Sequence, residues 1–149
     1  MKIALTKTAL AGAFLTALVG NSMADPIADR QAIMKDMGRA VGSVAKIARG
    51  QQDFDAALVK AALETMAADA QKLDADTLFP EGSENGGDTE ASPKIWEDRS
   101  GFVAIIDKYK ADTAAAVAAD PQDLAAFQEQ FKTVTANCGT CHQNFRVKR

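Results

Sequence analysis

Residues 120–146 read DPQDLAAFQEQFKTVTANCGTCHQNFR, and this stretch combines a fold signal with a chemical one. Its apolar side chains recur at the three- and four-residue spacing of a helix that buries one face. The stretch begins with Asp120-Pro121, which is typical of a helix start, because aspartate caps free backbone N–H groups and proline lacks one. Asp123 then suits the dipole of the first turn. The predicted inner face comprises Leu124, Phe127, Phe131, Val134, Cys138, Cys141 and Phe145.

Two further helices are predicted on the N-terminal side of a long break. Asp25 can cap a helix that opens with proline and ends at Gly50, since glycine is favoured just after a helix. Asp53 can cap a second helix, whose apolar stripe continues as far as Leu73. Residues 74–92 carry proline and several glycines and predict an irregular connection.

The third of the four predicted helices begins at Ser92-Pro93, again a cap followed by proline. Its apolar stripe runs from Trp96 to Tyr109. Gly101 lies inside this helix, where it costs about 1 kcal/mol relative to alanine and weakens the helix start. Four amphipathic helices, joined by two short connections and one long one, predict an all-α fold, an antiparallel four-helix bundle.

Composition limits the possible functions. The chain of 149 residues is 47% hydrophobic and 25% charged, which predicts one globular domain. Its net charge of −3 argues against nucleic acid as a partner. The two cysteines and single histidine exclude a four-ligand Cys/His zinc site, a four-cysteine iron–sulfur cluster and a multi-disulfide scaffold.

Residues 1–24 are predicted to be a cleaved signal peptide. Lys2 and Lys7 precede an apolar run, and Ser22-Met23-Ala24 is a small-x-small cleavage signal. The run is shorter than the roughly 20 apolar residues of a transmembrane helix, although a retained membrane anchor is the alternative. Cleavage would leave a domain of residues 25–149 and change the net charge from −3 to −5. We therefore predict export to a bacterial periplasm, without membrane attachment after cleavage.

The pentapeptide CGTCH at residues 138–142 contains both cysteines and the only histidine. C-x-x-C-H is the attachment signature of a c-type haem. Thiols three residues apart lie on one side of a helical turn, where each can add to one haem vinyl group. The adjacent imidazole is then held beneath the ring, where a neutral nitrogen can coordinate iron.

Three alternatives to haem attachment remain. A thioredoxin-like dithiol would need a βαβ context, which the sequence does not indicate. A disulfide between Cys138 and Cys141 would close a very short loop and stabilise the chain little. A zinc site with these two cysteines and His142 would lack a fourth protein ligand.

The mature chain resembles class II cytochromes c, which comprise cytochrome c′ and its low-spin relatives of the cytochrome c-556 type. This resemblance implies a four-helix bundle with one covalently attached haem c on the last helix. Cytochrome c′ is itself a standard example of a four-helix bundle, so the resemblance and the apolar periodicity lead to the same fold. The matching segments are Arg30-Gln31 with Met34, Gly86-Gly87-Asp88, Pro93-Lys94-Ile95-Trp96, and Cys138 to His142 followed by Phe145 and Arg146.

The resemblance implies the ligands of the haem. Cys138 and Cys141 would form its covalent attachment, and His142 would be its proximal iron ligand. Met34 matches the position that faces the distal side. A methionine there binds iron in low-spin relatives, whereas in cytochrome c′ proper the residue at this position leaves the iron five-coordinate, and some five-coordinate relatives also have methionine there. A methionine that only fills the core is the alternative. Met37, one turn further along, is predicted to be a packing residue.

The resemblance also implies contacts at the haem edge. Arg30 and Gln31 match positions that bind a haem propionate, a role that suits a guanidinium, although both can equally be solvated at a helix start. Thr89 and Glu90 correspond loosely to a further edge contact. Arg146 lies one turn after the histidine, where it can either influence the proximal ligand or belong to the basic tail.

Several apolar residues are expected either to surround the haem or to fill an ordinary bundle core, and the sequence does not distinguish the two. Trp96 is expected in the core. The candidates for the haem wall are Phe127, Phe131, Val134 and Phe145.

These observations predict an exported monohaem cytochrome that carries one electron at a time and turns over no substrate. A five-coordinate cytochrome c′-like protein that binds nitric oxide or carbon monoxide is the alternative. A haem-free structural or metal-binding bundle is the third possibility. The acidic mature chain suggests a basic redox partner. The resemblance makes a homodimer through the first two helices plausible.

Overall fold

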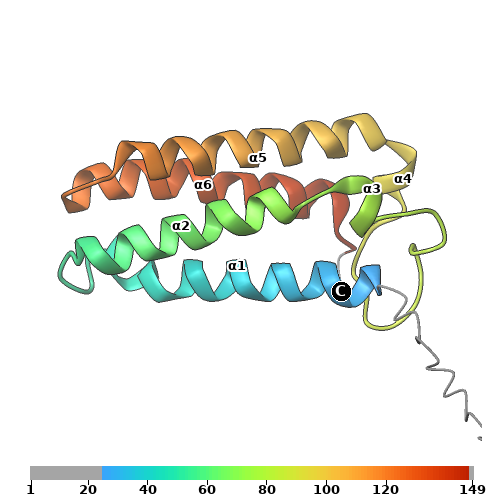
Figure 1. The fold of residues 1–149 in the computed structure, drawn as a ribbon, viewed down its shortest axis with the longest axis horizontal. Coiled ribbons are helices and arrows are strands. Elements are labelled where there is room, and N and C mark those ends of the chain that lie inside the picture. Colours follow the sequence, from blue (N-terminus) through green and yellow to red (C-terminus); the bar gives the residue numbers. More distant parts are fainter. Residues whose placement is uncertain (1–24, 148–149) are drawn as a thin grey trace, which may run out of the picture.

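A computed structural model describes residues 25–147, and four long helices make up most of it (Figure 1). The predicted all-α, antiparallel four-helix bundle is confirmed. The predicted signal peptide, residues 1–24, lies outside the described residues. The long helices are α1 (Pro26–Ala48), α2 (Ala56–Lys72), α5 (Arg99–Ala119) and α6 (Leu124–Phe145), and the short ones are α3 (Ala75–Leu78) and α4 (Lys94–Glu97).

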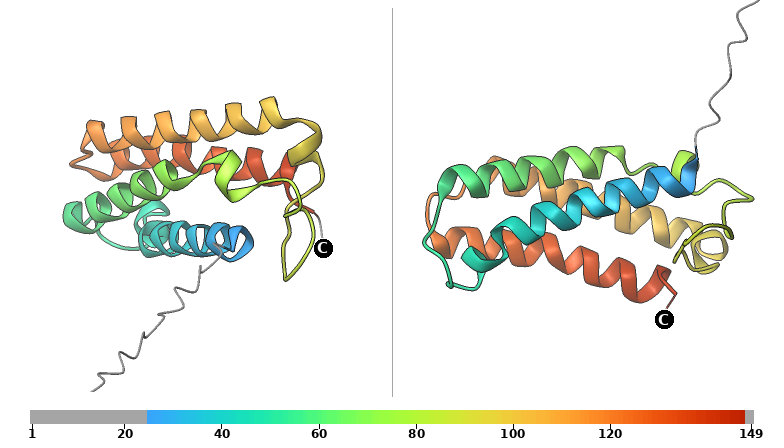
Figure 2. Two further views of the ribbon diagram at one scale, coloured as in Figure 1. Left: turned by 45° about the vertical axis from the view of Figure 1, so that its right-hand side comes forward. Right: turned by 90° about the horizontal axis from the view of Figure 1, so that it is seen from below.

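Long helices that follow one another along the chain also pack together: α1 packs against α2, α2 against α5, and α5 against α6. The contact between α1 and α6, which closes the bundle, is much less extensive. Seen from below, these two helices diverge toward the end of the bundle that carries α3 and α4 (Figure 2). One side of the bundle is therefore open at that end.

Each long helix contributes fully buried side chains to one continuous core. Val44 of α1, Met66 of α2, Ala116 of α5 and Phe127 of α6 are completely inaccessible to solvent. Burial of one large apolar side chain contributes roughly 1.5–3 kcal/mol, so this core is the main stabilising interaction between the helices.

The first two predicted helices begin as follows in the structure. The Asp25 carboxylate caps α1 as predicted, because it accepts hydrogen bonds from Ile27 N and Ala28 N. The predicted cap at Asp53 is wrong, because Asp55 caps α2 by accepting from Leu58 N at 2.9 Å. Both aspartates precede the same apolar stripe, and the sequence does not separate them.

The predicted helix start at Asp120-Pro121 is also wrong. Asp120 ends α5 in a left-handed conformation, with φ 39°. Asp123, for which the sequence predicts only a favourable interaction with the helix dipole, is the N-cap of α6 and accepts from Ala126 N at 2.8 Å. The aspartate–proline pair marks the end of one helix rather than the start of the next.

The third predicted helix is divided at Asp98, which separates α4 from α5. The Asp98 carboxylate caps α5 by accepting from Gly101 N at 3.1 Å. A Cβ atom at Gly101 would lie 2.5 Å from this carboxylate. Gly101 therefore weakens no helix interior, because it is part of the N-cap that begins α5.

The predicted break at residues 74–92 contains one short helix, α3, and otherwise no helix or extended strand. Together with α4 it covers the end of the bundle at which α1 and α6 diverge (Figure 1). That end of the bundle is therefore covered by a largely irregular segment with two short helices.

Candidate functional site

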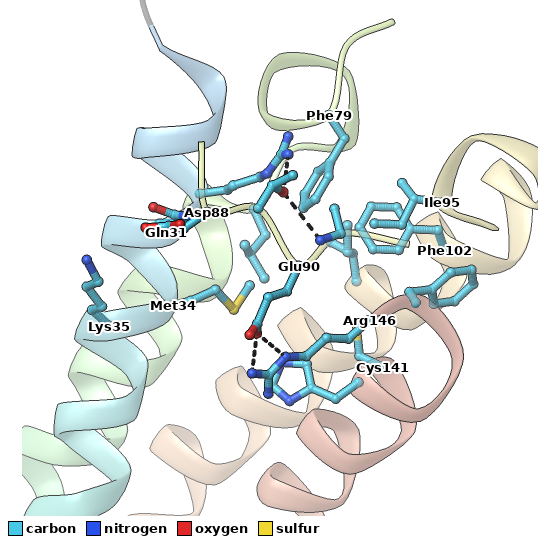
Figure 3. A pocket seen from close by; sticks show the side chains of 17 residues that line it. Gln31, Met34, Lys35, Phe79, Asp88, Glu90, Ile95, Phe102, Cys141 and Arg146 are labelled. Carbon is cyan, nitrogen blue, oxygen red and sulfur yellow. Dashed lines mark hydrogen bonds and ion pairs between the residues drawn. The ribbon is translucent and has the colours of Figure 1, made fainter. Parts of the chain in front are cut away.

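A cavity of about 600 Å³ lies at the end of the bundle where α1 and α6 diverge (Figure 3). Its size is within the range of about 300–1,000 Å³ that ligand pockets occupy. Residues from α1, α5, α6 and the 73–95 segment contribute to its wall. The cavity therefore lies between the diverging ends of α1 and α6, beneath the segment that covers this end of the bundle. The lining residues are Arg30, Gln31, Met34, Lys35, Leu73, Phe79, Asp88, Thr89, Glu90, Ala91, Ile95, Phe102, Ile106, Cys141, His142, Phe145 and Arg146.

The cysteines of the C-x-x-C-H motif lie on the last turns of α6. Cys141 lines the cavity, and Cys138 lies one turn deeper, half-buried against the hydrophobic core. Both are free thiols, so the alternative of a disulfide between them is not present in the structure. Burial raises the pKa of Cys141 to about 11 and also raises the pKa of Cys138, so both thiols are protonated at neutral pH.

His142 also lines the cavity and is exposed to solvent. Partial burial lowers the pKa of its imidazole, and the nearby Arg146 cation lowers it further, while Glu90 opposes the change. The imidazole is therefore neutral at pH 7. A neutral ring keeps a nitrogen lone pair that is available to a metal.

Met34 lies on α1, and its side chain points into the cavity (Figure 3). It is 37% exposed, whereas Met37, one turn along the same helix, is 7% exposed and belongs to the core. The prediction that Met37 is a packing residue is confirmed, and its sulfur accepts a hydrogen bond from the Tyr109 hydroxyl at 3.2 Å. Met34 does not fill the core in this way.

Arg30 is almost fully buried, at 4% exposed, and connects α1 to the 78–89 segment. Its Nη1 donates to Leu78 O at 2.9 Å and to Ser83 Oγ at 3.0 Å. Its Nη2 donates to Ser83 O at 2.8 Å and to Thr89 Oγ1 at 2.7 Å. The guanidinium also lies 4.8 Å from the centre of the Phe79 ring, a cation–π distance.

These bonds occupy all four terminal N–H groups of Arg30 with partners from the protein. The resemblance implies instead that Arg30 contacts a haem propionate. Among the described residues no hydrogen bond involves its Nε–H group, which could donate to a propionate. Gln31 lies beside it on the cavity wall. Arg30 therefore positions one wall of the cavity, and its propionate role stays a prediction.

Thr89, Glu90 and Arg146 all line the cavity, as the predicted edge contacts require. Glu90 and Arg146 form an ion pair (Figure 3). The backbone reinforces this link, because Val147 N donates to Glu90 O and Ser92 N donates to Phe145 O, each at 2.9 Å. The end of α6 is thus fastened to the segment that closes the cavity.

The sequence does not predict the whole of the cavity wall. Of the four apolar candidates for a haem wall, only Phe145 lines it, while the other three pack along the bundle away from the cavity. Trp96 is half-buried, as a core residue, and its indole N–H donates to Pro80 O. Lys35 also lines the cavity, and its position next to Met34 is the one feature of the sequence that could have indicated this. The other lining residues that sequence reasoning misses are Leu73, Phe79, Asp88, Ala91, Ile95, Phe102 and Ile106.

Within residues 25–147, no three side chains of His, Cys, Asp or Glu are grouped so that they could hold a metal ion. The alternative of a three-ligand zinc site has no support there. The same residues include no helix that is both long and apolar enough to cross a membrane.

Comparison with known proteins places this chain in a family. The family described as Cytochrome C' matches residues 25–146. The chain belongs to the cytochrome c′ family. This cytochrome is 42% identical over 125 residues to a protein of Rhodopseudomonas palustris named cytochrome c′, with 84% of each chain covered. It is 40% identical to the cytochrome c-556 of Agrobacterium fabrum, with 85% of this chain and 84% of that protein covered.

Solved structures agree with this assignment. Cytochrome c′ from R. palustris matches with a TM-score of 0.78 at 40% identity, covering 85% of this chain and 99% of that one. A structural model of oxidised R. palustris cytochrome c556 matches with a TM-score of 0.72 at 30% identity, covering 84% and 98%. The resemblance to class II cytochromes c is therefore confirmed.

Cytochromes of this family carry one covalently attached haem c, and the site of this chain fits that group. The cavity has the volume of a ligand pocket, and apolar and aromatic side chains make up much of its wall. Cys141 and His142 line it from one helix and Met34 from another. Thiols, a neutral imidazole and a thioether are the donors that c-type haems use.

Proposed function

We propose that this cytochrome carries single electrons with a haem held by Cys138 and Cys141. His142 is its proximal ligand and Met34 its distal ligand. The observation that carries the proposal is the position of Met34. A large apolar side chain 37% exposed in the mouth of a cavity lacks the packing expected of a core methionine, and a bound group would cover it.

The ligand chemistry follows from the environment of each side chain. The neutral imidazole of His142 presents a nitrogen to iron without first losing a proton. The thioether of Met34 is a soft ligand that raises the reduction potential of haem iron. Bound haem supplies a one-electron couple between ferric and ferrous iron. If His142 and Met34 both bind the iron, no ligand position remains for a substrate, so we propose no catalytic turnover.

The apolar wall contributes to the same function. Phe79, Ile95 and Phe102 are each less than 7% exposed and line the cavity. A dry environment limits access of water to the metal and tunes its potential. The ion pair of Glu90 and Arg146 places charge at the other side of the cavity, beside His142. In this arrangement Arg146 acts on the proximal ligand rather than belonging to a solvated tail.

The second candidate is a five-coordinate haem that binds nitric oxide or carbon monoxide. The comparison with relatives supports it as well, because the relative named cytochrome c′ and the relative named cytochrome c-556 are 42% and 40% identical. In this alternative Met34 lies over the iron without binding it. The distal position would then be open to a small gas.

An absorption spectrum separates the two candidates. We expect sharp low-spin bands in the reduced protein, unchanged by carbon monoxide. A broad high-spin spectrum that shifts with carbon monoxide would overturn methionine ligation and support the gas-binding alternative. The protein should be produced in a host with haem-attachment machinery.

The covalent attachment has its own test in the mass of the intact protein. We expect the mass of the cleaved chain plus one haem. Cys138→Ser and Cys141→Ser should each leave one thioether, and the double variant should lose covalent haem. A wild-type mass equal to that of the bare chain would exclude the haem and favour the structural bundle.

Export and partners form the remaining part of the proposal. We propose that residues 1–24 are removed and that the cytochrome acts in the periplasm, where it exchanges electrons with a basic partner. The net charge of −5 after cleavage supports such a partner by electrostatic steering. We further propose a homodimer through α1 and α2. One structural relative, at 25% identity, is described as a cytochrome c′ with ligand-controlled dimer dissociation.

A further inference from the structure

A haem in this cavity would bring two negatively charged propionates with it. These carboxylates lie on the edge of the ring opposite the two vinyl groups, which the thiols of Cys138 and Cys141 on α6 would hold. The propionates would therefore face the walls that α6 does not form, where the polar residues belong to α1 and to residues 88–90. A carboxylate that loses water needs a cation or a hydrogen-bond donor in exchange, so these walls must provide partners.

Two of the three cations on the cavity wall are already engaged with the protein. The three are Arg30, Lys35 and Arg146. Arg146 forms the ion pair with Glu90. Arg30 donates its four terminal N–H groups to oxygens of residues 78–89, which leaves one N–H group, at Nε. One N–H group cannot satisfy two carboxylates, because each carboxylate accepts several hydrogen bonds.

Lys35 is the third of these cations, and its ammonium group makes neither an ion pair nor a hydrogen bond with any of residues 25–147. The side chain is exposed at the margin of the cavity, next to Met34 (Figure 3). The carboxylate that follows it in the chain, Asp36, pairs with Arg39 instead. An ammonium group has three N–H donors. Lys35 thus offers the cavity a full positive charge and three free donors.

Gln31 adds a second donor on the same face of α1. It lies four positions before Lys35, a spacing that makes two side chains neighbours on a helix, and both residues line the cavity. The Gln31 amide makes no hydrogen bond within the described part of the chain. Asp88 also lines the cavity, and its negative charge would repel a propionate. A propionate on this wall therefore needs a cation.

We propose that Lys35 is the counter-ion of a haem propionate: its ammonium group donates to one of the two carboxylates, and Gln31 donates beside it. This assignment rests on the proposed haem in the cavity. The charge of Lys35 also acts on the iron, because a nearby positive charge favours the additional electron of the ferrous form. Lys35 therefore raises the reduction potential as well as holding the propionate.

The first test joins the two groups chemically in the haem-loaded protein. A water-soluble carbodiimide forms an amide between an ammonium group and a carboxylate in contact, and it becomes a urea by taking up the elements of water. After digestion, mass spectrometry should find the haem-bearing fragment of α6 joined through a propionate to the fragment that contains Lys35. A propionate joined instead to Lys94, which lies over the Phe145 ring, would overturn the proposal. A Lys35 joined to Asp88, or left without any cross-link, would overturn it as well.

The second test is the reduction potential. Lys35→Met keeps the alkyl chain but removes the charge, so the potential should fall, whereas Lys35→Arg should stay close to the wild type. Lys46→Met is the matched control, because it removes the same charge from an exposed position of α1 about 16 Å further along the helix axis. It should leave the potential close to the wild type. An unchanged potential in Lys35→Met, or equal shifts in Lys35→Met and Lys46→Met, would contradict the assignment.

These measurements also separate the assignment from a role of Lys35 in docking a redox partner. A docking cation would change the rate of electron exchange and leave the potential unchanged. Lys35 is exposed, so neither of its substitutions should prevent folding. The absorption spectrum and the intact mass report whether haem is attached. A protein without haem would refute the proposed function, whereas a haem protein without the cross-link and the shift would refute the role of Lys35 alone.

Discussion

Met34 is the residue on which the choice between electron transfer and gas binding depends. Its thioether lies in the cavity, partly exposed, and Met37 of the same helix is buried in the core. Replacing Met34 therefore tests a role in the cavity, and replacing Met37 tests a role in core packing.

We expect Met34→Ala to replace the low-spin spectrum with a high-spin one, to lower the reduction potential and to create a carbon monoxide site, because a soft sixth ligand is lost. Met37→Leu serves as the control. It conserves core volume, should cost less than about 1.5 kcal/mol and should leave the spectrum unchanged. An unaltered spectrum in Met34→Ala would show that the methionine only covers the haem.

The sequence predicts which residues form this site better than it predicts the hydrogen-bond partners of those residues. Cys141, His142 and Met34 can be identified because a short motif and a family pattern name them directly. The partners of Arg30 are 48 to 59 residues away, in a largely irregular segment. No periodicity or local motif encodes a contact over that distance, so its structural role could not be predicted.

At the scale of elements, Arg30 joins α1 to the 78–89 segment. We expect Arg30→Met to destabilise the protein by about 2–4 kcal/mol, because four acceptors lose their donor in a buried place. Denaturant unfolding measures the change, and amide exchange should accelerate within residues 78–89. Arg39→Met, on the exposed side of the same helix, should change stability by about 0.5 kcal/mol or less. Equal effects of the two substitutions would refute the role given to Arg30.

Asp112 links α5 to α6, and the link is sensitive to pH. It accepts hydrogen bonds from Lys108 of its own helix and, at 2.6 Å, from the buried Asn137 of α6. These bonds, chiefly the one from Lys108, lower the pKa of Asp112 in the folded state. Because the pKa of Asp112 is lower in the folded protein than in the unfolded chain, where it is near 3.9, the Asp112 charge stabilises the fold at pH values above the unfolded pKa. This stabilisation is lost as the pH falls through the folded pKa.

We therefore expect Asp112→Asn to cost about 1 kcal/mol at pH 7 and less as the pH falls below about 4. Urea unfolding of both proteins between pH 7 and pH 2 measures the difference. A difference that stays constant over this range would mean that the Asp112 charge contributes nothing to the link.

The four long helices could be predicted from the sequence because each follows a periodic apolar stripe. The start of α1 at Asp25 could be predicted too, but the starts of the other three could not, since more than one aspartate precedes each of them. The structure selects Asp55 over Asp53 and Asp123 over Asp120, and it begins α5 at Asp98. In each case the choice depends on which carboxylate reaches a free N–H group, a geometric fact that composition does not contain.

At the scale of the whole molecule, the proposed dimer uses the faces of α1 and α2 that lie outside the core. Gly38 and Gly42 lie about one turn apart on α1, and a Cβ atom built at either would meet nothing within 4 Å. Gly42→Glu should therefore preserve the monomer fold and the spectrum but oppose close approach of a second copy. Sedimentation measures the outcome. A dimer unaffected by this charge would place the interface elsewhere.

Packing between consecutive helices has a kinetic consequence. Because α1, α2, α5 and α6 contact their neighbours in chain order, much of the bundle joins segments close in sequence. Helical proteins with such local topology fold in microseconds to milliseconds. The bonds from Arg30 to Thr89 and from Arg146 to Glu90 instead hold an irregular segment against helices 59 and 56 residues away. The helices should therefore assemble first. The irregular segment that closes the haem cavity should be the last part of the chain to reach its native conformation.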